Sequence, residues 1–76
     1  MEFKLGRCRL IEILNEINWK QQTLADYTGI NKALISKYAN GNLKISYLNS
    51  IIITDIINEK TGSNYSPRDL YVILRK

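Results

Sequence analysis

Apolar residues recur every three or four positions along most of the chain, whereas the alternation typical of a half-buried strand is scarce. The first stripe at this spacing consists of Leu10, Ile13, Leu14 and Ile17. These residues share one face of a helix, and we expect that helix to cover residues 6–18.

Two shorter helices are predicted over residues 21–28 and 31–39. Gly29 follows the first of them, at the place where a residue in the left-handed conformation commonly ends a helix. Asn31 suits the N-cap of the second, because its side-chain oxygen can accept from free N–H groups. The Asn-Gly pair after residue 39 tolerates positive φ and closes that helix.

The segment over residues 46–60 is apolar almost all round, so its helix should be covered on more than one side. Its isoleucines also look strand-like, but polar interruptions and length favour a helix. A fifth helix is predicted near residues 66–75. Ser66 is its expected N-cap, Pro67 its first residue, and Asp69 its favourable first-turn charge.

The composition supports one small all-α domain over residues 1–76, in which five helices share a core. A single cysteine, Cys8, excludes an internal disulfide, and the absence of histidine argues against a zinc site. No apolar run has the length of a membrane span, and the N-terminal residues lack a signal peptide's pattern. We therefore expect a cytoplasmic protein that uses no metal and no cofactor.

The net charge of +4 is compatible with an anionic partner, but on composition alone a solvated basic surface explains it equally well. The position of the charge is more informative. Lys32, Lys37 and Lys44 occur in a stretch that contains no acid. Ile35 and Tyr38 are expected to pack inward, which leaves the first two lysines on the outer face of the helix over residues 31–39.

The stretch "QQTLADYTGINKALISKYANG", residues 21–41, resembles the lambda-repressor-like (Cro/cI, or XRE) helix-turn-helix family in residue type and spacing. The looser resemblance, in helix number and length, extends from about Leu10 to Ile57. It implies a five-helix lambda-repressor-like DNA-binding domain whose helix-turn-helix comprises the second and third helices. The third helix is then expected to enter the major groove of double-stranded DNA.

Carried over position by position, the resemblance implies a set of base-reading residues. They are Asn31, Lys32, Ala33, Ser36 and Lys37. Lysine can donate to guanine O6 and N7, and the alanine methyl can lie against a thymine methyl. The alternative is structural: Asn31 serves only as a cap, and the lysines are only solvated helix charges.

A second set is expected to contact DNA phosphates, which position a protein without specifying sequence. It comprises Lys20, Gln21, Asn40, Asn42 and Lys44. Gln21 matches the glutamine that begins the second helix in the family, where free N–H groups add partial positive charge.

The chain departs from the family pattern at two places. Leu34 stands where the family often has serine or threonine, and it could pack against a neighbouring helix or contact a thymine methyl. Leu14 and Ala39 replace an ion pair between an arginine and an acid, which well-packed apolar residues can do without loss of stability.

These observations predict a sequence-specific DNA-binding transcriptional regulator, of the kind found as phage or prophage repressors, that binds operator DNA in the nucleoid. Specific affinity normally requires a homodimer on a pseudo-palindrome. The segment over residues 66–75 either contacts a second copy or covers the helix over residues 46–60, and both can hold together.

The alternative function is protein–protein interaction, in which a helix-turn-helix relic serves as an accessory or anti-regulator factor with little DNA binding. Leu34 favours this reading, whereas the lysines oppose it. An enzyme is not expected, since the sequence offers no catalytic residues, no glycine-rich phosphate loop and no small-molecule ligand motif.

Overall fold

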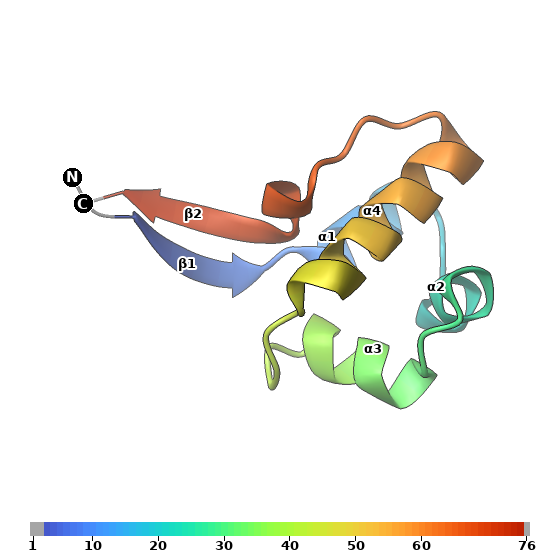
Figure 1. The fold of residues 1–76 in the computed structure, drawn as a ribbon, viewed down its shortest axis with the longest axis horizontal. Coiled ribbons are helices and arrows are strands. Elements are labelled where there is room, and N and C mark those ends of the chain that lie inside the picture. Colours follow the sequence, from blue (N-terminus) through green and yellow to red (C-terminus); the bar gives the residue numbers. More distant parts are fainter. Residues whose placement is uncertain (1–2, 76) are drawn as a thin grey trace.

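The computed structural model describes the backbone of residues 3–75 and the side chains of residues 6–72. The protein is mostly helical, with a small two-stranded sheet that projects from the helices (Figure 1). In chain order the elements are β1 (Phe3–Cys8), α1 (Leu10–Glu16), α2 (Gln21–Thr28), α3 (Lys32–Ala39), α4 (Tyr47–Thr61), the 3-10 turn η1 (Pro67–Leu70) and β2 (Tyr71–Arg75).

The prediction of one helix over residues 6–18 is wrong at both ends. Residues 6–8 belong to β1, and Arg9 precedes α1 without capping it through its side chain. At the other end the helix stops after Glu16, with Ile17 as its C-cap, and Asn18 adopts a left-handed conformation with φ 62°. The predicted apolar stripe is nevertheless confirmed, because its first three members are fully or almost fully buried.

The boundaries of α2 and α3 agree with the prediction. Gly29 ends α2 with φ 76°, and its N–H donates to the carbonyl of Ala25 at 2.9 Å. In a left-handed residue a side chain clashes with the backbone, so glycine is favoured here. The chain therefore turns within the three residues between α2 and α3, and α3 takes a different direction from α2 (Figure 1).

Helix α4 begins at a serine cap and ends at a left-handed glycine. The hydroxyl oxygen of Ser46 accepts from the N–H of Asn49 at 3.2 Å, and Gly62 has φ 71°. Two of its polar interruptions, Ser50 and Thr54, are buried. Thr54 donates to the carbonyl of Ser50 at 2.9 Å, so its hydroxyl is satisfied within the helix.

The fifth predicted helix is only one turn of 3-10 helix. Its start was predicted correctly, since the carboxylate of Asp69 accepts from the N–H of Ser66 at 2.8 Å and Pro67 is the first residue of the turn. From Tyr71 onward, however, the chain is extended and pairs with β1. The aromatic and β-branched run after Leu70 favours a strand once a partner strand is available.

The sheet joins the two ends of the described chain in antiparallel register. The partners are Phe3 with Arg75, Lys4 with Leu74, Leu5 with Ile73, and Cys8 with Tyr71, with a register shift between Leu5 and Cys8. Where the sheet meets the helices, the N–H of Arg9 donates to the carbonyl of Leu70 at 2.7 Å. An all-α fold was therefore correct for the helical body but missed this sheet.

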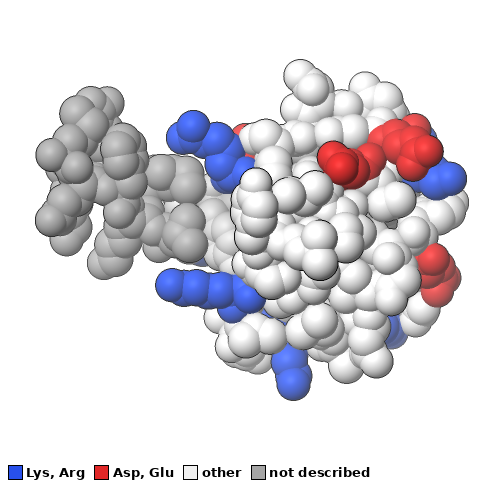
Figure 2. Space-filling view, viewed as in Figure 1, with Lys and Arg blue, Asp and Glu red and all other residues white. Residues whose placement is uncertain are grey.

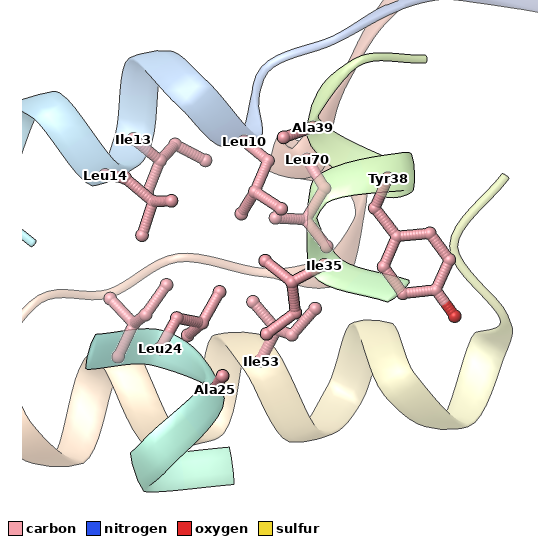
Figure 3. Packing of buried hydrophobic residues seen from close by; sticks show 11 residues of the cluster. Leu10, Ile13, Leu14, Leu24, Ala25, Ile35, Tyr38, Ala39, Ile53 and Leu70 are labelled. Carbon is pink, nitrogen blue, oxygen red and sulfur yellow. The ribbon is translucent and has the colours of Figure 1, made fainter. Parts of the chain in front are cut away.

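One core holds the helices together (Figure 3). Leu10 and Ile13 from α1, Leu24 from α2, Ile35 from α3 and Ile53 from α4 all have no exposed surface. Leu70 of η1 is buried in the same cluster, so the tail covers the core although it is not a helix. Among the described residues, none of the helices is both long and apolar enough to cross a membrane.

Gly29→Ala should lower the free energy of unfolding by about 1–2 kcal/mol, measured in urea, because alanine is strained at positive φ. Space is not the cause, since a Cβ at this position meets no atom within 4 Å. Gly29→Asn is the control and should cost less, because asparagine tolerates this conformation better. Equal stability of the alanine variant and the parent would contradict the left-handed turn.

Candidate functional site

Helix α3 packs by one side and is open on the other. Ile35, Tyr38 and Ala39 face the core, where Ile35 has no exposed surface and Tyr38 only 3% (Figure 3). The Tyr38 hydroxyl accepts from the side-chain amide of Asn49 at 2.9 Å, which links α3 to the first turn of α4. These contacts fix the rotation of α3 about its own axis and so decide which residues point outward.

The five predicted base-reading residues all lie on or beside the open side of α3. Asn31, Lys32, Ala33 and Lys37 are exposed, and Ser36 is half-buried. Within residues 6–72, ion pairs connect only Arg7 and Arg9 with Glu12, so neither lysine of α3 is neutralised by an acid there. The open side of α3 therefore carries positive charge and short side chains, and it is exposed to solvent.

Asn31 has a structural role. Its side-chain Oδ1 accepts from the N–H of Ala33 at 2.7 Å, as expected for an N-cap. The amide nitrogen of the same side chain keeps its two N–H donors for another partner. Capping and contact with a ligand are thus compatible for this residue.

Leu34 turns away from the open side. It is half-buried and packs against the core cluster, which favours the first of the two readings that the sequence left open. Leu14 and Ala39 are likewise buried in the core, with 3% and 7% of their surfaces exposed. Buried apolar residues of the core thus occupy the positions where the resembling family has an ion pair.

The five predicted phosphate-binding residues fall into two groups. Lys20 and Gln21 line a depression beside α1, together with Trp19. Asn40 and Lys44 line a separate cleft at the C-terminal end of α3. Asn42 is exposed in the loop between these two residues.

Positive charge borders the open side of α3. In Figure 2 the blue side chains at the lower edge lie where α3 and the loop after it run in Figure 1, and no red side chain is seen between them in this view. Exposed acidic side chains lie on other helices, among them Asp26 on α2, and Asp55 and Glu59 on α4. Because of this distribution of charge, anions are attracted to the surface of α3 more than to that of α4.

The sequence reading missed one cation at this surface. Arg7, at the end of β1, lines the same cleft as Lys44, because β1 passes beside the loop between α3 and α4. The predicted helix over residues 6–18 would have included Arg7 in its first turn, and not in a strand. The alternation of apolar and polar residues before residue 8 was the available signal for a strand.

Cys8 also lines this cleft and is half-buried. Burial raises the pKa of its thiol, which keeps the group neutral near pH 7 and poorly nucleophilic. Within the described part of the chain, His, Cys, Asp and Glu residues form no group that could hold a metal ion.

Comparisons with protein-family models, with curated proteins and with solved structures gave no match to this chain.

Asn31→Ala should lower the free energy of unfolding by about 1 kcal/mol, because the helix loses its side-chain cap. Asn31→Asp should retain most of the stability, since aspartate caps about as well as asparagine. Urea unfolding of the parent and both variants measures this. If the alanine and aspartate variants are equally stable, the bond to the Ala33 N–H contributes nothing.

Proposed function

We propose that this protein is a sequence-specific DNA-binding transcriptional regulator that places α3 in the major groove. The observation that carries the proposal is the two-sided character of α3. Its back is fixed in the core by Ile35 and Tyr38, whereas its front exposes Lys32 and Lys37 with a small residue, Ala33, between them. The major groove is about 12 Å wide and admits a helix presented in this way.

The connection from α2 to α3 supports the same proposal. Two eight-residue helices are joined through the left-handed Gly29, and the second lies at the edge of the helical body (Figure 1). This arrangement, together with the resemblance of residues 21–41, corresponds to a helix-turn-helix in which α3 is the recognition helix. The fifth helix of the resembling family is replaced here by η1 and β2, so any membership is divergent.

In this proposal the lysines of α3 donate to base edges, and Lys44 contacts a phosphate just beyond the helix. Guanine O6 and N7 are the acceptors that suit a lysine donor. Occupation of a promoter by the protein would exclude polymerase and repress transcription.

Protein–protein interaction is the rival function. The packing of Leu34 against the core cluster weakens the sequence feature that favoured it, because only part of this side chain is exposed. An electrophoretic shift with random double-stranded DNA at low salt separates the two. Absence of a shift at micromolar protein would support the rival.

Lys32→Ala and Lys37→Ala should each weaken binding to the preferred DNA site by about 1–3 kcal/mol, if each lysine contacts a base. Selection from a random DNA library first identifies that site and its symmetry, and fluorescence anisotropy then measures affinity. Lys44→Ala should weaken binding to all sequences alike.

Lys60→Ala is the matched control, since it removes the same charge from α4. The Lys60 ammonium lies over the ring of Tyr27, 5.1 Å from its centroid. If the α3 variants bind the selected site no worse than this control, α3 does not read the DNA.

Two copies on one site would supply the affinity that a single small domain lacks, with half-sites about 34 Å apart. The first turn of α4 exposes apolar side chains suited to such a contact: Tyr47 is 80% exposed and Leu48 65%. Leu48→Glu should therefore reduce self-association, as measured by sedimentation over a range of protein concentrations. A parent that stays monomeric on and off the selected DNA would contradict the homodimer.

A further inference from the structure

A cleft of about 260 Å³ lies where the sheet joins the helical body. Three segments that are far apart in the sequence form its walls: the end of β1, the loop between α3 and α4, and the start of β2. The polar residues that line it are Arg7, Asn40, Lys44 and Tyr71. No carboxylate belongs to its described lining; Glu12 pairs with Arg7 from outside the cleft, whereas Lys44 forms no ion pair with the acids of residues 6–72.

Each of these side chains has a hydrogen-bond donor to offer. One guanidinium nitrogen of Arg7, Nη1, is engaged by the carboxylate of Glu12, and the other N–H groups remain. The Tyr71 hydroxyl accepts from the N–H of Ile45 at 2.9 Å, which leaves its own proton for donation. Lys44 is exposed, and its ammonium forms no ion pair with the acids of residues 6–72.

The remaining walls do not oppose an anion. The Cys8 thiol stays neutral, because burial raises its pKa. Ala39 and Leu43 add apolar surface, which carries no negative charge that would repel an anion. Arginine and lysine are the side chains that bind phosphate most strongly, through charge-assisted hydrogen bonds.

We propose that this cleft binds a phosphate group through Arg7 and Lys44, with Tyr71 and Asn40 as further donors. In the DNA complex proposed above, this group is a backbone phosphate beside the C-terminal end of α3, since α3 ends at Ala39 and the cleft begins there. That source rests on the proposed function. The chemistry of the cleft also fits free phosphate, and the experiment separates the two sources.

The first measurement is the salt dependence of DNA binding by the intact protein, followed by fluorescence anisotropy in increasing KCl. Arg7→Gln and Lys44→Gln should each reduce the slope of log K against log salt, and by about 1 when combined because they share one phosphate, without changing the sequence preference. Arg7→Lys should restore most of the slope, because it restores the charge.

Arg68→Gln is the control for charge alone. Arg68 is exposed on η1 and does not line the cleft, so its loss should change the slope less. Arg7→Gln also removes an ion pair with Glu12, and thermal unfolding checks that each variant is folded. Lys44→Gln breaks no ion pair of the described residues and tests the cleft even if the Arg7 variant is unstable.

The second measurement is an NMR titration of the DNA-free protein with inorganic phosphate. Saturable shifts at Tyr71 that disappear in Arg7→Gln support the cleft with free phosphate as a ligand, even if the parent binds no DNA and the proposed function fails. Reduced slopes without saturable shifts support the DNA phosphate as the source. If Arg7→Gln and Lys44→Gln behave like Arg68→Gln on DNA, and phosphate gives no saturation, the cleft proposal is overturned while DNA binding by α3 stands.

Discussion

The burial of one side of α3 is the constraint on which the rest of the molecule depends. An isolated helix of eight residues is unstable in water, so α3 exists only because its back is packed. Full burial of Ile35 alone contributes roughly 1.5–3 kcal/mol. Tyr38 adds a hydrogen bond to Asn49 that also fixes the distance to α4. Because stability comes from the back, the front of α3 can carry residues chosen for another purpose, such as Lys32 and Lys37.

Helix α4, against which α3 is held, combines buried polar residues with an exposed apolar first turn. Helix α4 is apolar on nearly every side, yet it buries the small polar residues Ser50 and Thr54. Both hydroxyls donate to carbonyls of their own helix, so burial leaves no unsatisfied group. Leu48 of the same helix, by contrast, is apolar and mostly exposed. Farther along α4, Ile53 and Ile57 are fully buried, so it is the exposed apolar surface of the first turn that gives reason to consider a second copy as a partner.

Local signals made most of the helical body predictable, whereas the sheet was not. The limits of α2, α3 and α4 follow from residues within one turn of each end: Gly29, Asn31, Ser46 and Gly62 act through backbone preference and capping. The sheet pairs strands from opposite ends of the chain, and neither strand has a local partner that would identify it. The capping residues before Leu70 led to the prediction of a fifth helix. They do start a helical turn, but they carry no information on where that turn ends. The open face of α3 was predictable from the helical spacing of Ile35 and Tyr38, and Arg7 was missed together with its strand.

The sheet matters to the surface of α3 because it is tied to the loop that follows this helix. The Tyr71 hydroxyl accepts from the N–H of Ile45, and thereby connects β2 to the segment between α3 and α4. Lys44 lies one residue before that bond, so its backbone position depends on the start of β2. Cys8 pairs with Tyr71 across the sheet, which places Arg7 of β1 at the same junction. Two cations from distant parts of the sequence are thus held at one place by strand pairing and one side-chain hydrogen bond. Because two strands alone are only marginally stable in water, the pairing depends in turn on Leu70, which anchors the start of β2 in the same core as Ile35.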